Sequence, residues 1–188
     1  KRAILLNEPK EFKTFVTAVI FVAAFKYVVK QRLKFAEIII IFPAVQCDVF
    51  PALLTTTWYN NVFFYNEFVS EEKKQDFIKN CYCFLFPSVY NSEAFGITQI
   101  EALSYGKPII NTNLDTGVPW VSVHELTGYT AEPNNVQSLK ESIVKMDKLS
   151  INDYKLFCHN AKLRHQELFD NKVVKKQLLS LFKYENII

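Results

Sequence analysis

The stretch FLFPSVYNSEAFGITQIEALSYGKPIIN, residues 84–111, decides how the rest of the chain is interpreted. The short apolar run Phe84–Phe86, ended by Pro87, is typical of a buried parallel strand. A polar loop over residues 88–95 follows, and a helix is predicted to begin at Gly96. A strand that feeds a loop and a helix N-terminus at the carboxyl edge of a parallel sheet is where α/β proteins hold anionic ligands.

The end of this predicted helix is also marked in the sequence. Gly106 is expected to be the C-cap, Pro108 follows just beyond it, and Ile109–Ile110 starts the next buried strand. Within the helix, the apolar positions expected to face a core are Ile97, Ile100, Ala102 and Leu103. The whole stretch therefore predicts strand, loop, helix, turn and strand.

Two carboxylates stand near the start of the predicted helix. Glu93 lies in the loop just before it, and Glu101 lies five residues after Gly96, roughly 7 Å along the axis at about 1.5 Å per residue. Between them the N–H groups of Gly96, Ile97 and Thr98 suit a phosphate. A second interpretation stays open, in which Glu93 is a solvated loop acid and Glu101 a surface helix residue, because the helix dipole favours acids near helix starts.

Three short segments of this stretch resemble the signature of the retaining, nucleotide-sugar-dependent glycosyltransferases of family four, which have the GT-B fold. The segments are Ser92–Ile97 (SEAFGI), Ile100–Leu103 (IEAL) and Gly106–Ile110 (GKPII). The family's Glu-x7-Glu motif matches Glu93 and Glu101. The resemblance implies that the chain is the C-terminal, donor-binding domain of such an enzyme.

The resemblance extends from about Glu67 to Pro133. Phe68–Lys73 looks like the family's loop and helix before the motif strand. The residues after the motif are similar to the segment that follows it, particularly in bacterial surface-polysaccharide enzymes; they are Asn113–Pro119, Thr127–Tyr129 and Glu132–Pro133. Outside this range the match is one of pattern only.

The resemblance also implies a role for each matched residue. Glu93 is the predicted catalytic residue, in contact with the sugar hydroxyls. Glu101 is expected to accept hydrogen bonds from the ribose, since ionised carboxylates are strong acceptors for paired hydroxyls. The amides of Gly96–Thr98 would hold the diphosphate. The base would pack against Phe68 and Val69, for which hydrophobic packing within the loop is an equal alternative.

The chain departs from the family in its phosphate-binding cations. The family offers an Arg and a Lys, five residues apart after the first strand, and this chain has Leu5 and Lys10 at those positions. Lys10 is therefore the candidate cation, and Lys13 is close enough to compete. A solvated surface lysine is the alternative interpretation of either. A missing cation weakens stabilisation of the charge on the leaving diphosphate.

Composition argues against several other classes of protein. The chain has 188 residues, enough for one domain with a core, and its net charge of +3 gives no indication of nucleic-acid binding. Its cysteines lack metal-binding spacing, and Cys81 and Cys83 are interpreted as buried, reduced thiols of a cytosolic protein. Its three histidines, His124, His159 and His165, are too far apart in the pattern to form a metal site.

Strands alternate with helices along the chain, which predicts a doubly wound, mostly parallel, Rossmann-like α/β sheet. Further strands are expected at Arg2–Leu6, Phe35–Phe42 and Asn61–Tyr65, with short extended segments at Trp120–Val123 and Tyr129–Ala131. Helices are expected at Lys13–Gln31, at Val49–Tyr59, from Ser70 to about Asn80, after Asn134 or Asn135, from Ser150 with Asp153 in its capping box, and at Lys172–Lys183.

The leading hypothesis is the donor domain of a hexosyltransferase that acts in surface polysaccharide or lipopolysaccharide synthesis. The donor substrate is a nucleoside diphosphate sugar, with a UDP-sugar as first choice. No metal or cofactor is expected, because the helix dipole and a lysine take the diphosphate charge. The chain begins on a strand rather than a leader, so residues 1–188 are interpreted as one domain from a longer protein.

The absent N-terminal domain is expected to hold the acceptor, a glycan or a lipid-linked glycan, so the isolated domain is not expected to be active alone. The predicted location is the cytoplasm. The apolar segment Phe15–Val29 is too short to span a bilayer and is expected to be a fully buried helix. Cover by a missing domain, by a partner or by the inner face of the membrane stays open as an alternative.

Two other hypotheses also stay open. One is a non-catalytic, glycosyltransferase-like binding or scaffold module, which the missing arginine and the apolar Phe15–Val29 segment favour. The other is a different GT-B enzyme, such as a sugar-nucleotide epimerase or phosphorylase, because one fold carries many activities. The spacing of Glu93 and Glu101 argues against the last.

Overall fold

The computed structural model describes residues 3–7, 37–41, 62–65 and 69–184, with side chains from Val69 to Phe182. Six strands in these ranges form one parallel sheet in the order β3-β2-β1-β4-β5-β6. They are β1 (Ala3–Asn7), β2 (Glu37–Ile41), β3 (Val62–Tyr65), β4 (Cys83–Leu85), β5 (Ile109–Thr112) and β6 (Gly128–Ala131). The predicted Rossmann-like parallel sheet is confirmed.

The strand order reverses between β1 and β4, which pair with each other inside the sheet. Leu5 lies beside Ile39 of β2 on one side and beside Phe84 of β4 on the other. In open α/β sheets, ligands bind outside the carboxyl ends of the strands at such a switch point. β4 ends at this edge with Leu85, and the loop that follows it carries Glu93.

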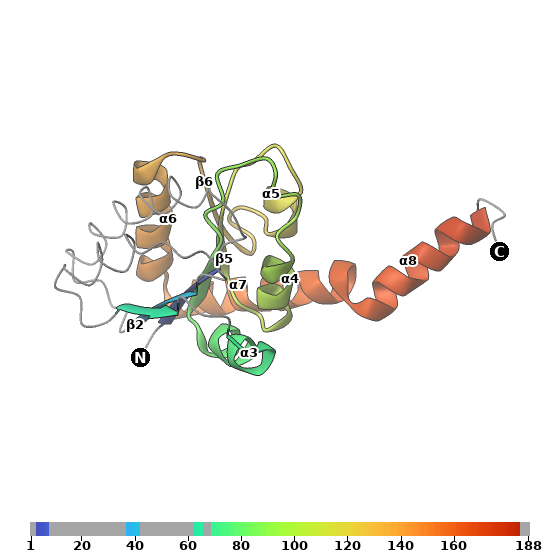
Figure 1. The fold of residues 1–188 in the computed structure, drawn as a ribbon, viewed down its shortest axis with the longest axis horizontal. Helices are drawn as coiled ribbons and strands as arrows, with labels where there is room; N and C mark the ends of the chain where they lie inside the picture. The colour runs from blue at the N-terminus through green and yellow to red at the C-terminus, as the bar shows by residue number, and fades with distance from the viewer. Residues whose placement is uncertain (1–2, 8–36, 42–61, 66–68, 185–188) are drawn as a thin grey trace.

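Helices cover both faces of the sheet in the part of the chain that the structure describes. They are α3 (Glu71–Asn80), α4 (Ile97–Ser104), α5 (Val118–Val121), α6 (Val136–Lys148), α7 (Ile151–Arg164), the π-helix η1 (His165–Phe169) and α8 (Asn171–Tyr184). Figure 1 shows α6 on one side of β5 and β6, and α4 with α5 on the other. After η1, α8 extends away from the body of the domain.

The helix starts that the sequence marks are confirmed. Ser70, Asn135 and Ser150 are the N-caps of α3, α6 and α7. Each side chain accepts a hydrogen bond from the backbone N–H three residues later, which satisfies one of the unpaired donors of the first turn. These caps explain why the three helices begin where local sequence predicts.

The end of α4 has the paired hydrogen bonds of a Schellman motif. The N–H of Gly106 bonds the carbonyl of Leu103 at 2.8 Å, and the N–H of Lys107 bonds that of Ala102 at 3.0 Å. Gly106 has a φ of 65°, in the left-handed region that favours glycine. The predicted end of the helix is therefore confirmed, with Tyr105 as the C-cap and the glycine one residue beyond it.

The described core lies around β4 and β5, whose residues are all buried. α4 contributes Ala102 and Leu103 to it, and α3 contributes Ile78. Cys81 and Cys83 are buried free thiols, as predicted. Burial raises the pKa of Cys81 to about 12. Such a thiol stays protonated at neutral pH and behaves as a small apolar group of the core.

The extended segment predicted at Trp120–Val123 is wrong in its first half. α5 covers Val118–Val121, and the N–H of Val121 bonds the carbonyl of Gly117 at 3.0 Å. Pro119 lies in the first turn of this short helix, where its missing N–H and fixed φ are tolerated. By contrast, Tyr129–Ala131 is extended as predicted, in β6.

Ile97 does not face the core, contrary to prediction, and is 72% exposed. The buried residues of α4 are Gln99, Ala102 and Leu103. At 3.6 residues per turn, Ile97 lies on the other side of the helix from these three, on the same side as Glu101. This side of α4 is therefore open at the helix start.

Several predicted elements fall outside the described residues, namely the helices at Lys13–Gln31 and Val49–Tyr59 and the apolar segment Phe15–Val29. Among the helices that are described, none combines the length and apolarity needed to cross a bilayer. The π-helix η1 was not predicted, since nothing in the sequence pattern distinguishes it from an ordinary continuation of α7.

Candidate functional site

The candidate site lies at the carboxyl edge of the sheet, where the loops after β4 and β5 meet. The N–H of Gly117 bonds the carbonyl of Ala94 at 2.8 Å. The hydroxyl of Thr112 donates to the carbonyl of Ser88. These bonds hold the loop before α4 against the loop after β5, and Figure 1 shows the two running side by side next to α5.

The start of α4 depends on Gly96. This residue is buried, and its φ of 70° lies in the left-handed region. A Cβ at this position would lie 2.8 Å from the ring of Phe86 and 2.8 Å from Gln99 Nε2. Both the backbone conformation and the available space therefore require glycine here.

Glu93 caps α4 from within its own loop. Its Oε1 accepts a hydrogen bond from the N–H of Gly96 at 3.0 Å. A carboxylate in this position is stabilised by the helix dipole and by the N–H groups of the first turn. The amide of Gly96, predicted to face a phosphate, is thus bonded to Glu93. No described residue bonds the amides of Ile97 and Thr98, the next two donors along α4.

Glu101 lies one turn after Ile97, on the open side of α4. Lys74 Nζ, on α3, donates to Glu101 Oε1 at 3.1 Å and lies 3.0 Å from Oε2. The Glu101 side chain is 34% exposed. Its Oε2 is buried and accepts no hydrogen bond from any described residue. Glu101 is therefore an ion-paired carboxylate with unused acceptor capacity rather than a solvated surface acid.

Lys74 bridges two carboxylates. Besides Glu101, its Nζ lies 3.0 Å from Glu71 Oε2, one turn earlier on α3. Burial alone would lower the pKa of Lys74, but its bonds to Glu71 and Glu101 outweigh burial and raise that pKa above its ordinary value. Lys74 thus stays charged at neutral pH and joins α3 to α4.

A buried network of amide side chains lies beneath the start of α4. Gln99 Nε2 donates to the carbonyl of Phe95 at 3.1 Å, and Gln99 Oε1 accepts from Asn111 Nδ2 at 3.1 Å. Asn111 Nδ2 also lies 3.0 Å from the carbonyl of Val118 and 3.2 Å from that of Ser122. The network fixes the loop that carries Glu93 to β5 and to both ends of α5.

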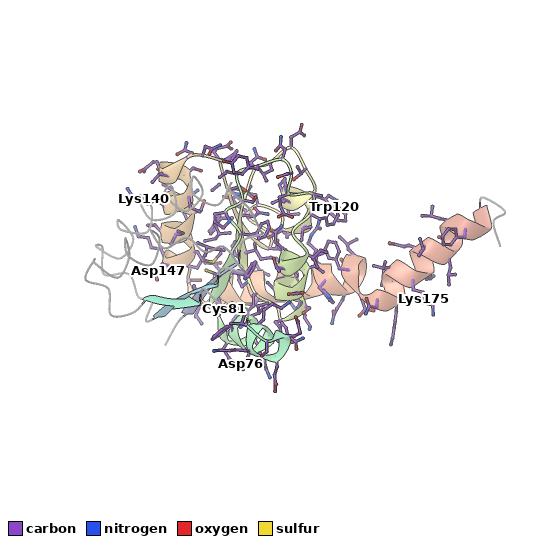
Figure 2. The ribbon with its side chains drawn as sticks, viewed as in Figure 1. Asp76, Cys81, Trp120, Lys140, Asp147 and Lys175 are labelled. Carbon is purple, nitrogen blue, oxygen red and sulfur yellow. The ribbon has the colours of Figure 1, made fainter. Side chains whose placement is uncertain are left out.

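An aromatic cluster covers the outside of the same loop. The ring of Trp120 lies 5.5 Å from that of Phe95 and 5.4 Å from that of Phe169, between centroids. The Arg164 guanidinium stands 5.3 Å from the Trp120 ring and donates to the carbonyls of Val121 and Trp120. Figure 2 shows Trp120 on the α5 side of the domain. The cluster connects the loop before α4 to η1.

Three further predicted site residues have different outcomes. Lys10 and Phe68 lie outside the described residues. Val69 is half-buried and packs against the core cluster that includes Phe84 and Leu103. This contact agrees with the alternative of hydrophobic packing within the loop. A contact between Val69 and a nucleotide base stays a prediction.

Lys74 is the charged residue that sequence reasoning missed. It is 27 residues from Glu101 in the sequence, so no local pattern joins the two. The only available signal was its place on the predicted helix that begins after Ser70, and that helix carries several charged residues.

Curated relatives match the chain over part of its length. D-rhamnosyltransferase WbpZ of Pseudomonas aeruginosa is 33% identical over 75 residues, which is 40% of this chain and 20% of the relative. O-antigen chain mannosyltransferase C of Escherichia coli is 30% identical over 103 residues, which is 54% of this chain and 27% of the relative. The chain thus matches about a quarter of the length of these relatives.

Solved structures share the fold. A glycosyltransferase from Rickettsia africae matches 97% of this chain and 47% of its own, with a TM-score of 0.78 and 18% identity. Anabaena HepE in complex with UDP matches 97% of this chain and 49% of its own, with a TM-score of 0.76 and 16% identity. The C-terminal domain of the group 1 glycosyl transferase LpcC from Francisella tularensis matches 91% of this chain and 87% of its own, with a TM-score of 0.69 and 17% identity.

The family model for glycosyl transferases group 1 matches residues 55–164, which is more than half of the chain. The matched range includes α3, α4, both carboxylates and the buried network between them. The solved structures from Rickettsia africae and Francisella tularensis are glycosyltransferases by their names, and the predicted GT-B fold is confirmed. Strand order, site and relatives therefore lead to one conclusion: the chain belongs to the glycosyl transferases group 1 family.

Proposed function

We propose that this chain is the donor-binding domain of a retaining hexosyltransferase. The observation that carries the proposal is the placement of Glu93, Gly96 and Glu101 around one helix start at the switch point of the sheet. The relatives transfer D-rhamnosyl and mannosyl groups by their names, which supports a hexosyl donor. Family membership supports transfer as the reaction.

The diphosphate of the donor binds at the N-terminus of α4. The amides of Ile97 and Thr98 are the first donors there without a partner among the described residues, and Ile97 is open to solvent. The positive end of the helix dipole attracts the negative phosphates. A UDP-sugar is the first candidate donor, because the structural neighbour HepE was solved with UDP and with UDP-glucose.

The two carboxylates receive the two sugars of the donor. Glu101 accepts a hydrogen bond from the ribose hydroxyls through Oε1, which has a second lone pair beside the bond from Lys74. Glu93, anchored through Oε1 on Gly96, turns its remaining acceptor sites to the hydroxyls of the transferred hexose. The short distance in sequence between Glu93 and the phosphate-binding amides suits a sugar attached directly to the diphosphate.

In the reaction, the bond between the anomeric carbon and the diphosphate oxygen breaks, the acceptor hydroxyl oxygen bonds the same carbon, and the hydroxyl proton is released to water. The nucleoside diphosphate leaves with an added negative charge. The N-terminus of α4 stabilises this charge, and Lys10 is proposed as the assisting cation. Base contacts with Phe68 and Val69 complete the donor site.

The acceptor, a surface glycan or lipid-linked glycan, is proposed to bind a separate N-terminal domain across a cleft. The LpcC fragment supports this view, since a chain of nearly the same extent is there called a C-terminal domain. The names of the relatives support a role in O-antigen or related polysaccharide synthesis. We place that synthesis in the cytoplasm, at the inner face of the membrane.

The test is calorimetric titration of the chain with UDP, GDP and ADP. We expect one of them to bind saturably, and Glu101→Ala to weaken that binding about ten- to a hundredfold, since a hydrogen bond to a charged group contributes about 1.5–3 kcal/mol. Glu72→Gln is the matched control, because Glu72 is an exposed acid on α3. It should leave binding unchanged.

A folded chain that binds none of the three nucleotides at millimolar concentration would contradict the proposal and favour the non-catalytic module. Binding that Glu101→Ala leaves intact would place the nucleotide elsewhere. If the isolated chain transfers sugar at an ordinary enzymatic rate, the proposal of a separate acceptor domain is wrong, but the proposal of a donor site stands.

A further inference from the structure

Lys74 reaches the ribose-binding candidate Glu101 from a different helix. Its Nζ contacts both carboxylate oxygens, at 3.1 Å and 3.0 Å. The Lys74 side chain is 20% exposed and the Glu101 side chain 34% exposed. An ion pair on the open surface contributes little, but a partly buried cation that contacts both oxygens restricts rotation of the carboxylate.

The second partner of Lys74 does not explain this geometry. Glu71 is 65% exposed, one turn away on the same helix, and also bonds Gln75 Nε2 at 3.2 Å. Such a pair stabilises a helix only slightly, because both groups are well solvated when apart. Glu101 differs, since its Oε2 is buried with no hydrogen-bond donor among the described residues. The cation at Lys74 is what compensates that buried oxygen.

We propose that Lys74 is a positioning residue for ribose recognition, which holds the Glu101 carboxylate in a fixed orientation before the nucleotide binds. The inference rests on the proposed function, in which Glu101 receives the ribose. It adds a residue on α3 to a site otherwise built from α4 and its preceding loop.

The acceptor capacity of Glu101 is compatible with this role. An ionised carboxylate offers about four lone-pair sites on its two oxygens. Lys74 uses one site on Oε1 and lies beside Oε2 without forming a hydrogen bond to it. Because Oε2 is buried, the site that remains for a ribose hydroxyl is the second lone pair of Oε1. Without Lys74, the carboxylate would rotate, and nucleotide binding would have to order it at a cost in affinity.

The test compares ribonucleotides with their 2′-deoxy counterparts. UDP, GDP and ADP, and the three 2′-deoxy forms, are titrated calorimetrically into wild type, Lys74→Met, Lys74→Arg and Glu71→Gln. We expect wild type to prefer the ribonucleotide that it binds. Lys74→Met should weaken that ribonucleotide about five- to tenfold and its deoxy form much less, because the lost interaction acts on the hydroxyls. Lys74→Arg should restore much of the preference, and Glu71→Gln should not change it.

Other results of these titrations would contradict either the role of Lys74 or the proposed function. Equal weakening of both nucleotide forms by Lys74→Met, with an unchanged ribose preference, would show that Lys74 acts only on general folding or charge. An unchanged affinity for both would show that Lys74 has no role in the site. If folded wild type binds no nucleotide at all, the proposed function itself fails, and the inference fails with it. Thermal melting of each variant verifies that it is folded.

Discussion

The two motif carboxylates differ in what holds them. Glu93 is bonded by an amide of its own loop, three residues away, whereas Glu101 is bonded by a lysine from another helix, 27 residues away. The first contact forms wherever the loop and helix start form. The second requires α3 and α4 to pack together. The site thus has a local half, formed by Glu93 and Gly96, and a tertiary half, formed by Lys74 and Glu101. Different substitutions should disturb each half.

Gly96→Ala should disturb the local half most. The substitution places a side chain at a φ of 70° and a Cβ 2.8 Å from the Phe86 ring. Left-handed strain and overpacking together should lower the free energy of unfolding by about 2–4 kcal/mol. Denaturant unfolding measures this loss. Asn91→Ala, at an exposed position in the same loop, is the control and should change stability by less than about 0.5 kcal/mol.

Gln99→Leu should weaken the same half by a smaller amount. The carbonyl of Phe95 and Asn111 Nδ2 would each lose a buried partner, at a cost of about 1–3 kcal/mol in unfolding free energy. Gln137→Leu on exposed α6 should be nearly neutral, because Gln137 bonds only exposed groups. Equal effects of the two substitutions would contradict the importance of the buried network.

Raising the pH should separate the halves, because an amide holds Glu93 and a titratable lysine holds Glu101. Burial acts to lower the pKa of Lys74, but its two carboxylate partners raise it overall. Its contribution to stability is therefore complete below the unfolded-state pKa of about 10.4 and is lost as the pH rises through the higher folded-state value. Glu93 should keep its contact over the same range.

The buried thiols add to this alkaline loss. Burial raises the pKa of Cys81 to about 12 and that of Cys83 well above its usual range. The unfolded chain therefore releases thiol protons from about pH 8.5 upward, while the folded chain keeps them. Unfolding free energy should fall steadily above that pH, and Lys74→Met should remove only the part above about pH 10. A flat profile between about pH 8 and 11 would contradict both assignments.

Local sequence predicts most of the fold and the local half of the site. Side chains at Ser70, Asn135 and Ser150 cap the helices that they were expected to start. Gly96 and Gly106 mark the two ends of α4, because each has a left-handed φ value that favours glycine. This requirement is local, so it can be predicted from the sequence. The apolar runs of the strands, alternating with helices, predict a parallel sheet, but pairing between strands distant in sequence sets their order.

The tertiary half could not be predicted in this way. Lys74 is one of several charges on α3, and only the packing of α3 on α4 selects it as the partner of Glu101. Ile97 was expected to face the core because an apolar residue usually does, but the helix face is set by its neighbours in space. α5 was missed because a single helical turn has too few residues to show a period.

The most direct test of the divided site compares the effects of removing each carboxylate's charge on the binding of nucleotides and of nucleotide sugars. UDP, GDP and ADP are compared with UDP-glucose, GDP-mannose and ADP-glucose in wild type, Glu93→Gln and Glu101→Gln. Glu101→Gln should weaken a nucleotide and its sugar form equally, whereas Glu93→Gln should weaken only the sugar form, because Glu93 is assigned to the hexose. Equal effects of the two variants on both ligands would contradict the division of the site between Glu93 and Glu101.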